Sequence, residues 1–300
     1  MRRLLLSSLT VAALVAPAAA EITVGTAQGE VTLPDAPRTV AVYDMAALDS
    51  LLALGVQPAG TIENVTVPAL RAQVQDAARV GTLFEPDLEA LAGLAPDLIV
   101  VGGRSSTQLA AVSQVAPAID MTFGPDLLSD ARARIDGYGA IFGKAGEAAE
   151  LNASLDAQLA ALREAAEGQG RALIVLTNGT RMSAYGKGSR FGWIFEAAGL
   201  EEAAPGLDHA THGQAITHEF IAEVNPDWLF VVDRGAAIGE DGQGAEATLR
   251  SALVEGTAAW TRGQVVYLDP GAAYISAGGY SAMSLLMGQL TDAFSAADPS

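Results

Sequence analysis

The chain contains no cysteine among its 300 residues. Without thiols a protein forms neither a disulfide framework nor a thiolate metal site. It also lacks the cysteine through which bacterial proteins are attached to lipid near their N-terminus. We therefore expect a protein with no lipid anchor and no disulfide-based stability.

Basic residues are also scarce. The chain has 17 lysines and arginines against 35 aspartates and glutamates, which gives a formal net charge of −18. Nucleic-acid-binding proteins carry a basic patch, and no such cluster is visible, so we expect no nucleic-acid partner. The negative field also disfavours anionic ligands at long range. Any anion bound by this protein must be held by a local group of arginines.

Long hydrophobic runs are absent after the first twenty residues. That first stretch opens with two arginines, continues with an apolar run over residues 4–15, and ends with small residues at positions 18 and 20. This pattern is typical of a secretory signal, and the run is too short for a mature membrane anchor. We expect cleavage after Ala20 and a soluble, exported protein, which is periplasmic if the source has two membranes.

An internal repeat is the main feature that the chain does contain. The segment "PDLIVVGGR" ends at Arg104, and "PDWLFVVDR" ends at Arg234, 130 residues later. The same offset relates Glu89 to Glu219, each seven residues before the proline of its copy. Solenoid repeats recur every 20 to 50 residues or so. One repeat at this longer distance predicts two similarly built halves.

Strand and helix patterns alternate in both halves. Continuous apolar runs such as "DLIVVGG", "RALIVLTNG", "DWLFVVD" and "QVVYLDP" predict strands buried in parallel sheets. We expect the α/β fold class, with two α/β sandwich lobes, mainly parallel sheets and a ligand in the cleft between the lobes. The expected boundaries are an N-terminal lobe over 21–125, a helical strut over 126–170 and a C-terminal lobe over 171–300.

Arg104 and Arg234 each come directly after a predicted strand. Ligands of open α/β sheets bind beyond the carboxyl ends of the strands. If the two halves face each other, both arginines point into one cleft. The sequence thus predicts an anion-binding cleft to which each lobe contributes an arginine.

The chain resembles the two-lobed, helical-strut class of substrate-binding proteins of ABC importers. Within that class it is most similar to periplasmic binders of ferric catecholate siderophores. The segments that carry the resemblance include "VGTLFEPDLEALAGLAPDLIVVGGR", "GKGSRFGWIFEAAGL", "THGQAITHEFIAEVNPDWLFVVDRG" and "YLDPGAAYISAGG". The resemblance implies a monomer that delivers a ferric siderophore to an importer permease, without catalysis and without an intrinsic cofactor. Iron would be carried as Fe(III) inside the siderophore complex.

By this resemblance Arg104, Arg190 and Arg234 line the siderophore pocket. A ferric tris-catecholate complex is a trianion with exposed aromatic faces, and planar guanidinium groups both hydrogen-bond to its oxygens and stack on its rings. His212 and Tyr274 correspond to residues with which some members complete the iron coordination of a siderophore that has only two catechols.

The same resemblance gives Glu89 and Glu219 a different role. In this class one surface glutamate on each lobe docks into a basic pocket of the permease. Judged from the local sequence alone, each is equally well explained as a carboxylate that the dipole favours near the N-terminus of a helix.

Several alternatives stay open from the residues alone. The same scaffold also carries haem or cobalamin, and Tyr274 could serve as a haem ligand. Zinc and manganese carriers of this class take ligands from both lobes, whereas the first half of this chain has no histidine. A metal-dependent hydrolase that uses His209, His212 and Glu219 is a more distant hypothesis.

Three aromatic residues flank Arg190 and could form a wall for the ligand. They are Tyr185, Phe191 and Trp193. The helical spacing of "GWIFEAAGL" favours packing in the core for Trp193.

Overall fold

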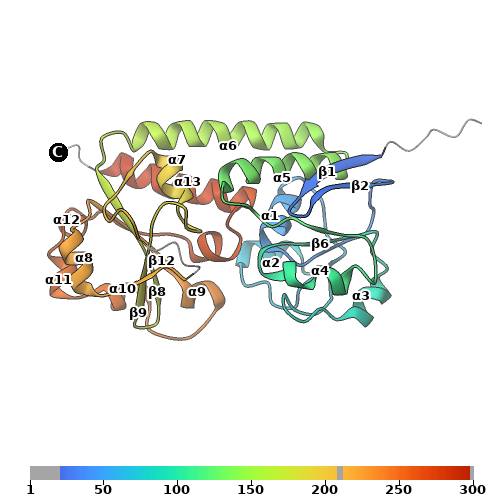
Figure 1. Cartoon of the computed structure of the whole chain (residues 1–300), viewed down its shortest axis with the longest axis horizontal. Coiled ribbons are helices and arrows are strands. Elements are labelled where there is room, and N and C mark those ends of the chain that lie inside the picture. Colours follow the sequence, from blue (N-terminus) through green and yellow to red (C-terminus); the bar gives the residue numbers. More distant parts are fainter. Residues whose placement is uncertain (1–20, 208–211, 298–300) are drawn as a thin grey trace, which may run out of the picture.

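The computed structural model describes residues 21–207 and 212–297 of the chain. Two α/β lobes lie side by side, and a layer of long helices runs across both (Figure 1). Each lobe has its own sheet, and most of the strand pairs are parallel. The predicted fold class is therefore confirmed.

The N-terminal lobe is built on a five-stranded parallel sheet of order β5-β4-β3-β6-β7. Its central strands are apolar and fully buried, as continuous apolar runs predict for a sheet covered on both faces. The strands are β3 (Val40–Val42), β4 (Gly60–Thr61), β5 (Ala78–Arg79), β6 (Leu98–Val101) and β7 (Ala118–Asp120). The helices are α1 (Met45–Ala53), α2 (Pro68–Gln73), α3 (Leu88–Leu94), the 3₁₀ helix η1 (Gly103–Gln108) and α4 (Leu109–Val112).

A hairpin that the sequence analysis missed precedes this sheet. It consists of β1 (Ile22–Thr26) and β2 (Gly29–Leu33), which pair antiparallel. The turn between them places Gly29 at a φ of +104°, a conformation that glycine adopts without strain. Arg134 donates to the carbonyl of Gly25 at 2.7 Å and so ties the hairpin to the helical layer.

The C-terminal lobe has a six-stranded mixed sheet of order β11-β9-β8-β12-β13, with β10 beside β8. Strand β9 runs antiparallel to both of its neighbours, β8 and β11. The strands are β8 (Arg171–Asn178), β9 (Arg181–Tyr185), β10 (Glu201–Glu202), β11 (Gln214–Ile216), β12 (Trp228–Asp233) and β13 (Val265–Tyr267). The helices are α7 (Trp193–Ala198), α8 (His218–Val224), α9 (Arg234–Ile238), α10 (Ala245–Leu249), α11 (Ala252–Glu255), α12 (Ala258–Thr261) and the short π-helical turn η2 (Gly271–Ile275).

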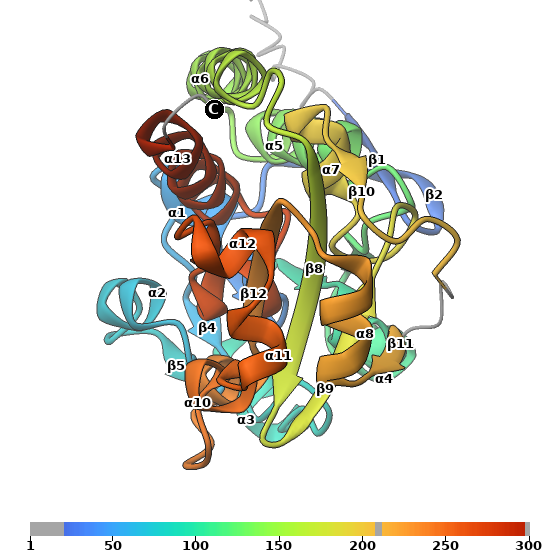
Figure 2. The ribbon, with the colours of Figure 1, turned by 90° about the vertical axis from the view of Figure 1, so that its left-hand side faces the viewer.

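Alternate residues of β12 belong to two different cores. Leu229 and Val231 pack in an outer core under α8, α10, α11 and α12, which cover the face seen in Figure 2. Phe230 and Val232 belong to the larger inner core, which continues into the N-terminal lobe. The period of two along a strand explains this division.

The residues expected to form a strut make two helices. They are α5 (Leu127–Ile141) and α6 (Ala145–Ala165), which meet at Gly143 with a φ of +65°. The last helix, α13 (Tyr280–Ala296), runs beside α6 (Figure 1). Leucines of α6 and apolar residues of α13 are buried between them. Within the described residues, no helix is both long enough and apolar enough to cross a membrane.

A buried carboxylate joins the two halves of the chain. Asp49 on α1 accepts hydrogen bonds from the backbone nitrogens of Ser281 at 3.1 Å and Ala282 at 2.8 Å, at the start of α13. Gly279 makes this approach possible, because a methyl group there would lie 2.5 Å from the Asp49 carboxylate. The first helix of the N-terminal lobe thus caps the last helix of the chain.

A tight turn after β5 carries Leu83 and Phe84 on its tip. The backbone of Thr82 donates to Glu85 at 2.9 Å, and Gly81 stands before them with a φ of +92°. We expect Gly81→Ala to lower the free energy of unfolding by at least about 2 kcal/mol, because the added methyl would lie 2.3 Å from the Asp87 backbone nitrogen.

Gly143→Ala is the control for this prediction. Gly143 also has a positive φ, but nothing lies within 4 Å of a methyl group added there. Gly143→Ala should lower the free energy of unfolding by only about 1 kcal/mol, the penalty of the left-handed conformation alone. Urea unfolding followed by circular dichroism measures both, and equal losses would contradict the close packing of the turn.

Candidate functional site

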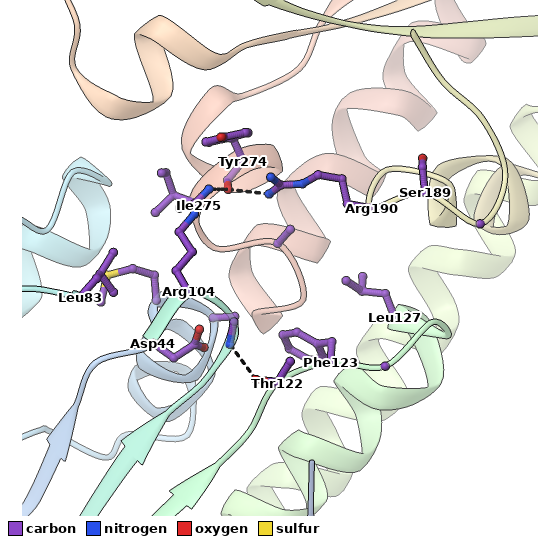
Figure 3. Close-up of a pocket in the computed structure, with 16 residues that line it drawn as sticks. Asp44, Leu83, Arg104, Thr122, Phe123, Leu127, Ser189, Arg190, Tyr274 and Ile275 are labelled. Atoms are coloured by element: carbon purple, nitrogen blue, oxygen red, sulfur yellow. Dashed lines mark hydrogen bonds between the residues drawn. The ribbon is translucent and has the colours of Figure 1, made fainter. Parts of the chain in front are cut away.

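The topology of the N-terminal sheet brings three polar side chains to one edge. Asp44, Arg104 and Thr122 follow the carboxyl ends of β3, β6 and β7, which are neighbours in the sheet. The hydroxyl of Thr122 accepts from the backbone nitrogen of Gly103 at 2.9 Å (Figure 3). This bond fixes the start of the segment from which the Arg104 side chain projects.

The C-terminal sheet presents a matching edge. Asn178 is the last residue of β8, and Arg234 and Tyr274 follow β12 and β13; these three strands are also neighbours. Arg234 donates to the amide oxygen of Asn178 at 3.1 Å and to the hydroxyl of Tyr274 at 3.2 Å. The predicted arrangement, with an arginine at a strand end of each lobe, is present in the fold.

Tyr274 lies on the π-helical turn η2. The backbone nitrogen of Ser276 donates to the carbonyl of Gly271 at 3.0 Å, which closes a five-residue turn. Asp269 accepts from the backbone of Ala272 at 2.7 Å and so fixes the start of the turn. Such wide turns are frequent at functional sites.

Three arginines converge on Tyr274. Arg104 and Arg190 donate to its backbone carbonyl at 3.1 and 3.0 Å (Figure 3). Their guanidinium carbons lie 4.6 and 4.4 Å from the centre of its ring, and that of Arg234 lies 5.9 Å away. Because Arg104 belongs to the N-terminal lobe, this cluster joins the two lobes.

These cations change the acidity of Tyr274. Burial alone would raise the pKa of the phenol. The hydrogen bond from Arg234 and the charges of Arg104 and Arg190 outweigh burial, so its pKa falls below the ordinary value. The pKa of Arg190 is itself lowered, first by burial and then by the charge of Arg104. The surroundings of Tyr274 therefore favour its phenolate form more than those of an ordinary tyrosine do.

The cleft between the lobes holds two cavities that meet at this cluster. The larger has a volume of about 530 Å³ and includes Asp44, Phe123 and Arg190 in its lining. The smaller has a volume of about 430 Å³ and includes Ile62, Phe84 and Arg234. The residues that line both are Met45, Leu83, Arg104, Tyr274 and Ile275. Four of the five predicted ligand-binding residues therefore lie together in the cleft.

Asp44 is a cleft residue that the sequence analysis missed. Its side chain caps α1 by accepting from the backbone nitrogen of Ala47 at 2.8 Å. Burial raises its pKa to about 6, although the backbone bonds and the charge of Arg104 act in the opposite direction. An aspartate directly before a helix reads as an ordinary cap in the sequence, so no local signal distinguished this one.

The remaining predicted residues lie away from these cavities. His212 is exposed in a turn just after residues 208–211 and lines neither cavity. Glu89 and Glu219 are exposed in the first turns of α3 and α8. His209, named in the hydrolase hypothesis, lies outside the described residues. Among the residues that are described, no three histidine, aspartate or glutamate side chains form a group that could hold a metal ion.

The three aromatic residues that flank Arg190 in sequence do not form a wall of the cleft. Trp193 is buried in the core, as its helical spacing predicted. Tyr185 and Phe191 are also buried, and their rings pack edge to face at 4.8 Å. The aromatic side chains of the cleft are Phe84, Phe123 and Tyr274. Tyr185 ends β9 and Trp193 begins α7, so both belong to elements whose side chains pack in the core.

Comparison with known proteins extends these observations. The sequence pattern of a periplasmic binding protein family matches residues 40–272. The petrobactin-binding protein YclQ of Bacillus subtilis is 33% identical over 268 residues, which cover 87% of this chain and 83% of YclQ. The ferric-anguibactin-binding protein FatB of Vibrio anguillarum is 29% identical over 270 residues, which cover 86% of this chain and 83% of FatB.

Solved structures show the same likeness. The crystal structure of YclQ matches with a TM-score of 0.85 at 32% identity, over 92% of this chain and 99% of YclQ. The periplasmic catecholate-siderophore binding protein VctP of Vibrio cholerae matches with a TM-score of 0.86 at 27% identity, over 91% of this chain and all of VctP, 100%. The likeness therefore covers both lobes and the helical layer.

The raised pKa of Asp44 predicts a pH-dependent stability. A carboxyl whose folded-state pKa is about 6, against an unfolded value near 4, stabilises the fold fully below pH 4 and loses that contribution as the pH rises through 6. Asp44→Asn keeps the helix cap but cannot ionise. Its free energy of unfolding should match the wild type near pH 4 and exceed it by about 2–3 kcal/mol at pH 8.

Urea unfolding of both proteins between pH 4 and pH 8 measures this difference. Other titrating groups are common to the two proteins and cancel. A difference that does not change with pH would mean that the Asp44 carboxylate is well solvated.

Proposed function

The chain belongs to the periplasmic binding protein family, and from this premise we propose that it captures a ferric catecholate-type siderophore and delivers it to the permease of an ABC importer. The site would lie in the cleft between the lobes. The iron would arrive and leave as Fe(III) inside the siderophore, as cargo rather than as a resident cofactor.

The convergence of Arg104, Arg190 and Arg234 carries this proposal. The chain as a whole repels anions, with a formal net charge of −18. Three guanidinium groups nevertheless gather in one cleft, around one tyrosine. Planar cations of this kind suit an anionic chelate with aromatic faces better than they suit haem or cobalamin.

The relatives support the same class of ligand. YclQ is named for petrobactin, FatB for ferric anguibactin, and VctP for catecholate siderophores. The volumes of the two cavities, about 530 and 430 Å³, fall within the usual range of small-molecule sites. Together they give room for a chelate that spans both sides of the Arg104–Tyr274 contact.

Tyr274 is our candidate protein ligand to iron. A phenolate is a hard oxygen donor that suits Fe(III), and the lowered pKa of Tyr274 makes the phenolate more accessible. For a siderophore with only two catechols we propose that Tyr274 and His212 fill the two open iron positions. Because His212 lines neither cavity in the structure, its contribution must be tested separately from that of Tyr274.

Delivery would use the outer surface of each lobe. We propose that Glu89 and Glu219, both exposed, dock on the permease, one from each lobe. We also propose that the chain acts as a monomer in the periplasm, after removal of residues 1–20. Energy for transport would come from the importer.

Titration with an Fe(III) bis-catecholate tests the function and the iron ligands together. Tryptophan quenching should report binding, and the visible catecholate-to-iron band should shift because the phenolate enters the iron coordination shell. Tyr274→Phe should abolish the shift, and His212→Ala should alter it. Quenching with an unshifted band would overturn the ligand assignment, and no quenching with either bis- or tris-catecholate chelates would overturn the function.

Single substitutions in the cleft measure the contribution of each cation. Replacing Arg104, Arg190 or Arg234 by glutamine should weaken an anionic ferric chelate by about 1.5–3 kcal/mol, which is roughly 10–100-fold in Kd. Arg262→Gln is the control, because Arg262 pairs with Asp227 before β12 begins, at the opposite end of the same sheet. Losses no larger than that of the control would place the anion elsewhere.

A further inference from the structure

The two cavities of the cleft differ in charge. Arg104 contributes to both, Arg190 only to the larger, and Arg234 only to the smaller. Asp44 is the acidic residue among the described side chains that line either one, and it lies in the larger cavity. An anionic chelate therefore meets a carboxylate on one side of the Arg104–Tyr274 contact and not on the other.

Local structure holds the Asp44 carboxylate in a fixed position. One oxygen accepts from Ala47 at 2.8 Å as the cap of α1. The other faces the loop after β6, where a methyl group on Gly103 would lie 3.5 Å from it. A methyl group on Gly102 would come within 3.0 Å of the carboxyl carbon. Two consecutive glycines thus leave the space that this carboxylate occupies.

No cation among the described residues is paired directly with Asp44, although the charge of Arg104 still acts on its pKa. Arg104 lines the same cavity as Asp44, but its side chain extends to the carbonyl of Tyr274, to which it donates at 3.1 Å (Figure 3). Over residues 21–207 and 212–297, no lysine, arginine or histidine forms an ion pair with Asp44. The carboxylate therefore lines a cavity without a directly paired cation.

In a site for anions, such a carboxylate weakens binding of the ligand. It repels the chelate that the arginines attract, and it is held in surroundings that disfavour its charge. Both costs are removed if the ligand itself carries a positive charge near this position. Specificity of this kind arises from repulsion of ligands that lack the matching group.

We propose that Asp44 binds a protonated amine in the linker of the siderophore, and so selects ferric chelates with a cationic linker over those without one. This inference rests on the proposed function, because it assigns a second recognition group within the same cleft. The catecholate end would lie against the arginines and Tyr274. The amine would lie beside α1, at the N-terminal lobe.

Two matched synthetic chelates test the inference. Each has two catecholamide groups on Fe(III), joined by linkers of equal length. In one linker the central group is a methylene, and in the other it is a secondary amine, which is protonated at neutral pH. Kd values come from tryptophan quenching at neutral pH and fixed salt.

The wild type should bind the amine chelate about 10-fold more tightly than the methylene chelate, as expected for a hydrogen bond between charged groups. Asp44→Asn should reduce this ratio to within about twofold, chiefly by weakening the amine chelate. It should bind the methylene chelate as well as the wild type or better, because the repelling charge is gone.

Asp126→Asn is the matched control. Asp126 also caps a helix, α5 of the strut, by accepting from Ser129 at 3.0 Å, but it is exposed and lines neither cavity. Its variant should keep the wild-type ratio. A loss of preference there as large as in Asp44→Asn would overturn the assignment to Asp44.

The outcomes separate this inference from the proposed function. Equal binding of both chelates by the wild type would overturn the role of Asp44 and leave the function standing. This measurement does not depend on the folding of any variant. A preference for the amine chelate that persists in Asp44→Asn would also overturn the role of Asp44. Binding of neither chelate would overturn this inference, and if a tris-catecholate chelate is not bound either, the proposed function falls with it.

Discussion

The packing of α13 against α6 and α1 is the constraint on which the rest of the structure depends. It holds the two sheets side by side, and the buried Asp49 carboxylate fixes the start of α13 to the first lobe. Tyr274 lies on η2, just before this helix begins. A displacement of α13 would therefore move the tyrosine on which the cleft arginines converge. Only a few residues of chain separate the turn that carries Tyr274 from the helix that joins the lobes.

Parallel topology explains why the polar groups gather where they do. Each sheet places the ends of three neighbouring strands at one edge, and the short segments that follow carry Arg104 in one lobe and Arg234 in the other. The like charges are tolerated because Tyr274 offers a carbonyl, a hydroxyl and an aromatic face at once. Arg104 and Arg190 share the carbonyl and the ring face, and Arg234 uses the hydroxyl.

Much of this arrangement could be predicted from the sequence, and the omissions have physical reasons. Arg104 and Arg234 were found because a repeat and two strand ends marked them together. Asp44 was missed because a cleft carboxylate and a helix cap have the same sequence pattern. The hairpin between β8 and β9 was also missed, although its two-residue loop begins with Gly179, at a φ of +58°. Whether His212 reaches the iron depends on a bound ligand, which no sequence pattern supplies.

The contacts of Tyr274 also bear on how firmly a cargo can be held. Arg104 and Arg190 already donate to its carbonyl, and Arg234 to its hydroxyl. A ligand oxygen that recruits one of these donors must displace an acceptor of the protein, so the gain is the difference between two hydrogen bonds. When the ligand departs, the same internal bonds can form again. These internal hydrogen bonds thus compete with the cargo, which limits its affinity and favours its release.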